Sequence, residues 1–403
     1  MSYMKMLLRI KGNCYKMQKV IIIGAGISGA TLANILANNN WQVEVYEIKN
    51  HIGGHCYDLL SKDNVLYHQY GPHIFHTERD NVIKFISQFA KFNGYINKVG
   101  VKLPRKQTQL PFNFKQIRKL DPKNGDAIVA FLKQKFPNQS KVSILELRKH
   151  REFEPLNKLT DWIFDNVYAP YTAKMWGIKI TDIDPSVIAR VGITLSDNES
   201  YFPTAKLQGL PVGGYTKMIA KMLDHKNIKV TLNFDALKAL KIQENQTFWN
   251  GELVKYPIVY CGPIEALCNY KYKHLPYRSL EFKFQTFNTS KKQYLPIINL
   301  PKDPKRTRTV EYKQMTKQRT QKTVISTEYP GAFQPNAKKW NIPYYPINNA
   351  TNNTHYQRYR NALKDTKNLY LLGRLAEYQY FDMDVAISSA IHLSERLLKQ
   401  TKK

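Results

Sequence analysis

Cysteine is scarce in this sequence, and long apolar runs are missing from it. The 403 residues include four cysteines, none of them in a CxxC pair, and no histidine cluster has the spacing of a zinc site. These absences speak against a disulfide framework and against a bound metal, and they favour reduced thiols in a cytosol-like, cytoplasmic compartment. No apolar run approaches the ~20 residues of a membrane span, so no membrane-spanning helix is expected.

Acidic residues are also in short supply. The chain has 61 Lys and Arg against 31 Asp and Glu, which gives a formal net charge of +30. Such a field favours an anionic partner, such as nucleic acid, a membrane surface or a phosphorylated small molecule. The basic residues are spread among tyrosine, phenylalanine and proline, and no basic arm stands out. We therefore favour a solvated lysine-rich surface over a nucleic-acid partner.

A glycine-rich motif lies between two strand-like segments near the start of the chain. In KVIIIGAGISGATLANILANN, Gly24, Gly26 and Gly29 form GxGxxG after a β-branched run and before an apolar helix. WQVEVYE then gives a second strand that ends at Glu47. This order predicts a βαβ unit whose helix N-terminus receives a pyrophosphate and whose terminal acid accepts hydrogen bonds from a ribose.

Two further elements favour FAD over NAD as the cofactor. Gly53 and Gly54 follow the acidic residue, as in flavin-binding Rossmann enzymes, where a second glycine pair lets the backbone pass close to the extended cofactor. Near the C-terminus, NLYLLGRLAEY ends a strand in Gly373-Arg374, and a helical stretch follows from Val385. By resemblance to such flavin-binding enzymes, Arg374 would face the FAD pyrophosphate. No second GxGxxG that would hold NAD(P)H is found.

Eight further motifs occur in an order and spacing that resemble the UDP-galactopyranose mutase family, from about Gln18 to Leu398. The family is a group of flavin-dependent isomerases that interconvert UDP-galactopyranose and UDP-galactofuranose. The resemblance implies a UDP-sugar substrate and reduced FAD, whose N5 forms an adduct with the sugar. The motifs are YGPHIFHT (70–77), LPFNF (110–114), YTAKMWG (171–177), GLPVGGYTKMIAKML (209–223), YRSL (277–280), TEYP (327–330), PYYPIN (343–348) and GRLAEYQYFDM (373–383).

The resemblance also implies an α/β fold: an FAD-binding Rossmann-type domain with an inserted helical domain and an antiparallel β-sheet domain. The chain itself predicts a helix over Thr77–Phe92, capped by Thr77 with Asp80 three residues on. The expected division is an N-terminal appendage (1–16), the FAD-binding domain in three parts (17–77, 209–265 and 365–403), the helical substrate domain (78–170), and the sheet domain in two parts (171–208, with an active-site loop, and 266–364). The oligomeric state, including a homodimer, stays open.

Matching the family motifs gives candidate site residues, although an isolated tyrosine more often serves packing with a satisfied hydroxyl. Arg308 is the candidate diphosphate arginine, and Tyr171 matches the tyrosine that stacks on uracil. The remaining substrate candidates are Trp176 near the sugar, the phenols Tyr201, Tyr344 or Tyr345, and Tyr380, the rim acid Asp382, and Arg278. His73 and His76 lie in a segment that resembles the flavin-facing histidine segment.

One departure from the family pattern concerns the charge on an active-site loop. The family has an arginine seven residues before the tyrosine that matches Tyr201, and Thr194 stands there in this chain. Arg190 or Lys206 would have to supply the missing charge. Three alternatives stay open: a mutase that acts on a related nucleotide sugar, an FAD-dependent oxidase, and a non-catalytic nucleotide-binding homologue.

Overall fold

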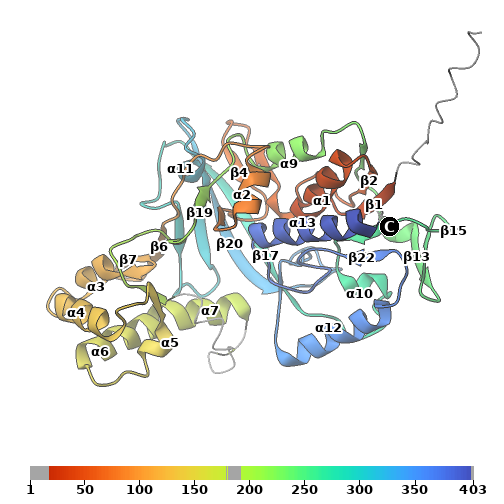
Figure 1. Cartoon of the computed structure of the whole chain (residues 1–403). Coiled ribbons are helices and arrows are strands. Elements are labelled where there is room, and N and C mark those ends of the chain that lie inside the picture. Colours follow the sequence, from red (N-terminus) through yellow and green to blue (C-terminus); the bar gives the residue numbers. More distant parts are fainter. Residues whose placement is uncertain (1–17, 178, 180–191, 401–403) are drawn as a thin grey trace, which may run out of the picture.

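A five-stranded parallel sheet forms the centre of the dinucleotide-binding part of the molecule (Figure 1). The computed structural model describes residues 18–177, 179 and 192–400. The strand order is β12 (Ile228–Thr231), β2 (Gln42–Tyr46), β1 (Lys19–Ile23), β16 (Ile258–Tyr260) and β22 (Leu369–Leu371). These strands come from three separate stretches of the chain, 19–46, 228–260 and 369–371.

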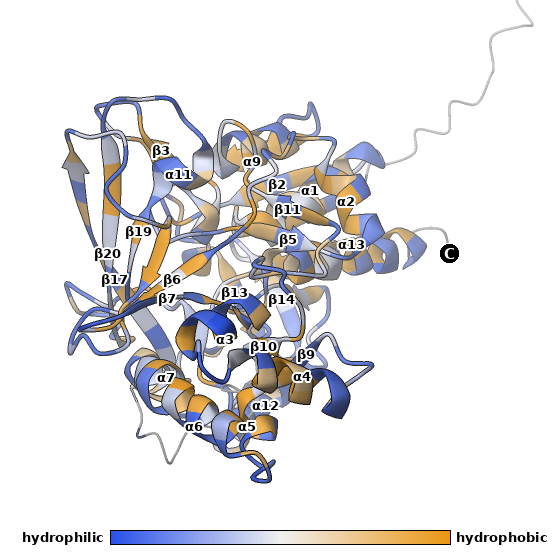
Figure 2. Cartoon of the chain, turned by 90° about the vertical axis from the view of Figure 1, so that its left-hand side faces the viewer, coloured by the Kyte–Doolittle hydropathy of each residue, from blue (hydrophilic) through white to orange (hydrophobic). Residues whose placement is uncertain are grey.

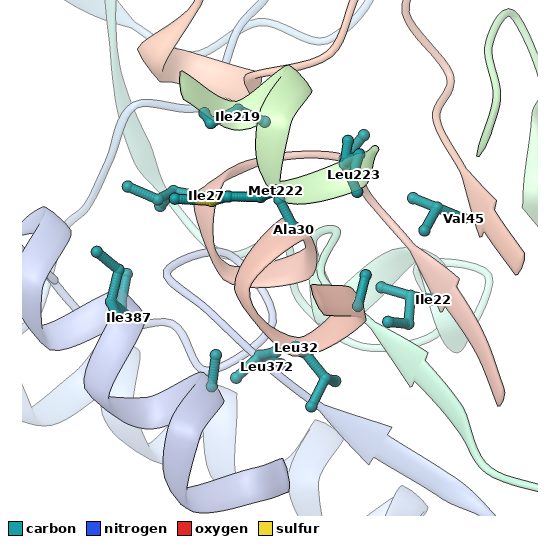
Figure 3. Packing of buried hydrophobic residues seen from close by; sticks show 14 of the residues in the cluster. Ile22, Ile27, Ala30, Leu32, Val45, Ile219, Met222, Leu223, Leu372 and Ile387 are labelled. Carbon is teal, nitrogen blue, oxygen red and sulfur yellow. The ribbon is translucent and has the colours of Figure 1, made fainter. Parts of the chain in front are cut away.

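The central strand β1 is buried on both of its faces, which explains its run of β-branched residues. Val20 and Ile22 point to a core cluster that contains α1 (Ile27–Asn38), α9 (Tyr215–Leu223) and α13 (Met383–Gln400). Figure 3 shows side chains of this cluster where the three helices meet. Ile21 and Ile23 point the other way, into a cluster under the hairpin strands β13 (Leu240–Gln243), β14 (Gln246–Trp249) and β15 (Glu252–Leu253).

A second, seven-stranded sheet stands beside this domain (Figure 1). All its neighbouring strands are antiparallel except β18 and β6, which run parallel. The strand order is β21 (Tyr345–Pro346), β17 (Tyr277–Phe287), β20 (Thr323–Ala332), β19 (Arg308–Glu311), β18 (Ile297–Asn299), β6 (Val99–Lys102) and β7 (Gln107–Leu110).

A helical unit packs at the lower end of this sheet in the view of Figure 1. In α6, the buried residues Leu156, Leu159, Thr160 and Ile163 recur at helical spacing, so one face meets the core. Figure 2 shows hydrophilic and hydrophobic residues interspersed along these helices, as expected for helices covered on one side. The unit contains α3 (Phe114–Leu120), α4 (Gly125–Lys135), α5 (Ile144–Leu147), α6 (Glu154–Ile163), a π-helical segment (Phe164–Tyr168) and α7 (Ala169–Trp176).

The remaining α-helices and β-strands of the described residues connect these parts. They are β3 (Asp58–Leu60), β4 (Leu66–His68), β5 (Phe75–Thr77), α2 (Asp80–Ile86), β8 (Phe112–Asn113), β9 (Lys141–Ser143), β10 (Gly192–Thr194), β11 (Leu207–Gly209), α10 (Ile264–Leu267), α11 (Tyr312–Thr316) and α12 (Ala350–Leu363).

Three local expectations differ from the structure. The segment 78–170 contributes β6 and β7 to the large sheet, although it was expected to be helical. Within 171–208, β10 pairs with β8 and β9, and β11 pairs with β5, so neither joins the large sheet. The helix predicted over Thr77–Phe92 is shorter, because Thr77 ends β5 and its hydroxyl accepts a bond from the amide of Arg79 just before α2 begins.

The expected appendage, residues 1–16, lies outside the described residues, and the domain boundaries stay a prediction. Across the described ranges, every helix is either too short or too polar to cross a bilayer.

Candidate functional site

A cavity of about 500 Å³ opens at the carboxyl ends of the parallel strands, next to the N-terminus of α1. Parallel sheets bind their ligands at this edge, and helix N-termini favour anions there. All eight residues predicted to bind the cofactor line this cavity: Gly24, Gly26, Gly29, Glu47, Gly53, Gly54, Gly373 and Arg374. Residues predicted from three distant segments of the sequence thus line one cavity.

The three glycines of GxGxxG are needed for different reasons. Gly24 has a φ of +122°, and a Cβ there would lie 2.9 Å from the Cβ of Cys261. A Cβ at Gly29 would lie 2.0 Å from the carbonyl oxygen of Gly24, so α1 could not approach β1. At Gly26, the nearest atom to an added Cβ is the Cα of Gly54, at an ordinary 3.8 Å. Packing within the protein therefore does not explain a glycine at 26, which lines the cavity.

The pair Gly53-Gly54 packs against the same loop. The amide of Gly53 donates to the carbonyl of Ala25 at 2.9 Å, and Gly26 and Gly53 form a parallel bridge. A Cβ at Gly54, where φ is +54°, would lie 3.1 Å from the Cα of Gly26. Contact between the two loops therefore requires glycine at position 54. The sequence analysis had given a different reason, namely space for the cofactor.

The carboxylate of Glu47 is held in place directly after β2. Its Oε2 accepts a bond from the amide of Ala25 at 2.8 Å, and its Oε1 accepts one from the amide of Lys49 at 3.0 Å. Each carboxylate oxygen can accept a second bond, so the group remains able to receive ribose hydroxyls. The cavity thus fits a dinucleotide at both its phosphate end and its ribose end.

Lys49 and His55 are among the cavity-lining residues that the sequence analysis missed. The ammonium of Lys49 lies 4.1 Å from the ring centre of Tyr70 and has no carboxylate within salt-bridge distance among the residues that the structure describes; burial lowers its pKa. His55 stacks on Tyr344 with ring centres 4.8 Å apart, and burial holds its pKa well below the usual range. A single lysine gives no signal in a lysine-rich chain, although its place two residues after the strand-end acid could have been noticed.

The candidate diphosphate arginine faces a buried carboxylate. The Nε of Arg308 donates to Glu328 Oε2 at 2.7 Å, while the hydroxyl of Thr307 donates to Glu328 Oε1 at 2.6 Å. Burial alone would lower the pKa of Arg308, but the carboxylate raises it well above the usual value. The motif TEYP was noted in the sequence, but no role was assigned to Glu328.

Arg374 joins the cavity to the predicted phenols. Its guanidinium carbon lies 5.6 Å from the ring centre of Tyr345 and 5.2 Å from that of Tyr380. These two rings stack on each other with centres 5.6 Å apart. Burial, opposed by the positive charge of Arg308, raises the pKa of Tyr345 to about 12 and shifts that of Tyr171 upward too. Both phenols therefore keep their protons at neutral pH and act as hydrogen-bond donors.

The two predicted histidines differ in their surroundings. His73 lines the cavity, and burial lowers its pKa to about 3; its Nδ1 lies 2.9 Å from the carbonyl oxygen of Gly71. His76 stacks on Phe202 at 3.6 Å, and its Nε2 lies 4.0 Å from Asp382 Oδ2. Burial lowers the pKa of His76, against the opposing effect of Asp382. Asp382 lines the cavity as well.

The other four substrate candidates differ in what they contact. Arg278 is buried, and its Nε donates to the carbonyl of Met175 at 2.7 Å, so it holds the end of α7. Trp176 is the last residue of that helix. Tyr344 is 2% exposed, which makes the partly exposed Tyr345 the better candidate of the pair. Tyr201 packs against the core of the helical unit.

The expectation about the loop charge is not supported at Thr194. This residue is 3% exposed and ends β10, where it pairs with Asn113 and Lys141 of the flanking strands. Thr194 is therefore a buried strand residue and does not stand in an exposed loop. Lys206 forms an exposed ion pair with Asp80 at 2.8 Å. Arg190 lies outside the described residues.

Comparison with known proteins decides the family. The family model "GLF: UDP-galactopyranose mutase" matches residues 166–380, and a model of an NAD(P)-binding Rossmann-like domain matches residues 22–89. The chain belongs to the UDP-galactopyranose mutase family. It is similar to the UDP-galactopyranose mutases of Mycoplasma genitalium, at 47% identity over 94% of each chain, and of Mycoplasma pneumoniae, at 42% identity over 94% of this chain and 96% of that one.

A solved structure agrees with the fold. The crystal structure of reduced UDP-galactopyranose mutase aligns with a TM-score of 0.70 at 15% identity, covering 95% of this chain and 96% of that one. The fold class and family identified from the sequence are thus confirmed, and with them the assignment to an isomerase. The Rossmann-like domain and the family indicate a flavin cofactor.

Proposed function

We propose that the protein interconverts UDP-galactopyranose and UDP-galactofuranose with non-covalently bound FAD in its reduced form. The observation that carries the proposal is Arg374, which lines the dinucleotide cavity and also lies over Tyr345 and Tyr380. A cofactor cavity and a cluster of phenols and guanidinium groups therefore share one wall. The name of the relatives, UDP-galactopyranose mutase, supports this choice of substrate.

The protein's own groups can hold both molecules. Gly26 leaves the cavity wall bare for the FAD pyrophosphate, and Glu47 accepts the ribose hydroxyls. Arg308 binds the diphosphate of the sugar nucleotide through the side of its guanidinium that does not face Glu328. Tyr345 and Tyr380 donate hydroxyl bonds to the same phosphates, and Tyr171 stacks on the uracil.

The remaining requirement is to keep the leaving diphosphate in place and water out. Reduced flavin supplies the nucleophile for ring contraction, and the protein supplies binding, orientation and charge stabilisation. Arg308 stays charged because Glu328 raises its pKa, so the charge that develops on the departing phosphate meets a fixed cation. His73 stays neutral because it is buried, and it adds no positive charge at the flavin end of the cavity.

Product analysis tests the proposal. Protein reduced with dithionite is incubated with a panel of nucleotide sugars that contains UDP-galactopyranose and its N-acetylated analogue, and the products are separated by chromatography. UDP-galactofuranose is expected from UDP-galactopyranose. Release of hydrogen peroxide with amine substrates, and no new sugar nucleotide, would instead support an oxidase.

A further inference from the structure

Helix α7 has few fully buried residues, so polar contacts help to hold it in place. It carries Tyr171 and Trp176, yet Ala169 is its only fully buried residue. The C-terminal carbonyl of Met175 accepts a bond from Arg278 on β17. A second polar contact comes from Lys174, whose side chain is partly buried. This side chain extends away from the helical unit to the turn between β18 and β19.

The ammonium of Lys174 is surrounded by three backbone carbonyl oxygens. Its Nζ donates to the carbonyl oxygens of Leu300 and Asp303 at 2.6 Å each, and the carbonyl oxygen of Pro301 lies at 3.3 Å. An ammonium that leaves water must replace the hydrogen bonds that it loses, and this turn supplies three acceptors at once. Three acceptors around one ammonium hold the Lys174 side chain in a single position. The exposed lysines of the surface are not held in this way.

The turn that receives Lys174 is closed by its own hydrogen bonds and leads directly to Arg308, the candidate diphosphate arginine. The amide of Leu300 donates to the carbonyl of Thr307 at 2.8 Å, which closes the turn just before Arg308. The carboxylate of Asp303 accepts bonds inside the turn from the amide of Arg306 at 2.6 Å and from its Nε at 2.7 Å.

A second lysine forms the reciprocal contact. Lys302, at the tip of the turn, donates to the carbonyl oxygen of Asp165 at 3.0 Å. Asp165 lies in the π-helical segment that leads into α7. The turn and the helical unit are therefore joined in both directions.

We propose that Lys174 is a positioning residue that fixes α7 relative to the strand carrying Arg308. The ring of Tyr171, proposed to stack on uracil, and the guanidinium of Arg308, proposed to bind the diphosphate, are then held at a fixed separation. This inference rests on the proposed function for the identity of the ligand. Misplacing a binding group by ~1 Å can cost about a hundredfold in rate or binding, so the docking contact has a measurable effect.

The test is the affinity of the flavin-loaded protein for UDP, measured by calorimetry. Lys174→Met removes the three donated bonds and keeps the length of the side chain. We expect the dissociation constant for UDP to rise about tenfold or more. In turnover, KM should rise by more than kcat falls, because binding is lost rather than chemistry. Lys174→Arg keeps a cationic donor and should restore most of the affinity.

Matched controls separate this effect from general damage. Lys158→Met removes a lysine of α6 that forms an exposed ion pair with Glu154, and it should change nothing. Flavin content should be equal in all variants. Hydrogen exchange of residues 169–177 should become faster in Lys174→Met, while that of 154–163 does not change. Lys302→Met should weaken UDP binding less, in the same direction, and it decides the question if Lys174→Met fails to fold.

Unchanged UDP affinity in the folded Lys174→Met protein, or in Lys302→Met if that variant alone folds, would overturn the inference. Failure of the wild-type protein to bind UDP would instead refute the proposed function. In that case, hydrogen exchange of α7 still tests the contact between Lys174 and the turn, because the measurement needs no nucleotide. Unchanged exchange of α7 in Lys174→Met would overturn the positioning role.

Discussion

Arg308 and Glu328 face each other across the neighbouring strands β19 and β20, with Nε of the guanidinium 2.7 Å from Oε2 of the carboxylate. The carboxylate side chain is 1% exposed, whereas that of the arginine is 19% exposed. The buried partner thus fixes the direction of a cation that still reaches the site. An arginine held this way pays little ordering entropy when it binds a phosphate.

The first prediction concerns this pair. Arg308→Ala should lower kcat/KM by ~10- to 100-fold or more, since a charge-assisted bond contributes about 1.5–3 kcal/mol. Glu328→Gln keeps hydrogen-bond acceptance but loses the charge, and it should lower kcat/KM less. Lys305→Ala, three residues away and exposed in the same turn, is the matched control and should keep near-normal kinetics. Equal losses in Lys305→Ala and Arg308→Ala would show that general charge matters, and not this position.

The second prediction separates folding from cofactor binding within the GxGxxG loop. Gly26→Ala should leave the melting temperature of the apoprotein nearly unchanged, because its Cβ would have ordinary contacts only. The same change should reduce the flavin retained per chain, as read from absorbance. Gly29→Ala should instead prevent correct folding, since its Cβ would lie 2.0 Å from the Gly24 carbonyl oxygen. Full flavin content in Gly26→Ala would argue against close approach of the cofactor there.

The third prediction reverses an expectation drawn from the family pattern. Thr194→Arg should not raise activity, because the new side chain would place a charge inside the small sheet of β8, β10 and β9. The cost of burying an unpaired charge is several kcal/mol, so the melting temperature should fall markedly. Thr194→Val, of similar shape, should be nearly neutral. Activity gained without loss of stability would place residue 194 at the substrate. Arg190→Ala tests the remaining candidate directly.

The fourth prediction is a loss of stability on mild acidification. Burial lowers the pKa values of His68 and His73 to about 3 in the folded protein. Below about pH 6.5 the unfolded chain binds protons at these residues and the folded chain does not. The free energy of unfolding should therefore fall as pH drops from 6.5, by up to ~1.4 kcal/mol per pH unit and histidine, and these groups should have no effect above pH 7.

Thermal melts between pH 8 and pH 5 measure this dependence. The slope for His68→Gln should be flatter than that of the wild type, whatever the absolute stability of the variant. Identical slopes would show that His68 does not titrate in this way.

The sequence located the cofactor cavity better than the substrate cluster. GxGxxG, Glu47 and the second glycine pair are local patterns, and the geometry of a βαβ unit brings them together whatever the rest of the chain does. Glu328 was missed because its role depends on its pairing with Arg308 across neighbouring strands. The two residues are 20 positions apart in the sequence. A buried carboxylate in a strand shows no pattern until its partner is known.

Tertiary contacts also give other residues surroundings that their positions in the sequence do not indicate. Thr194 was matched by its distance from Tyr201, but strand pairing with β8 and β9 buries it. Lys206 was considered as a spare cation, and a surface aspartate from a segment 126 residues away pairs with it. Arg278 matched a site motif, but its guanidinium binds the end of α7. Tertiary contacts decided each of these cases.

The central claim is that a reduced flavin serves an isomerisation without net oxidation. The most direct measurement is the amount of UDP-galactofuranose formed from UDP-galactopyranose per electron pair consumed, with anaerobic protein in the reduced and the oxidised state. The account predicts many turnovers by the reduced protein with no stoichiometric consumption of reductant, and almost none by the oxidised protein. Equal rates in the two states, or one electron pair consumed per product, would contradict it.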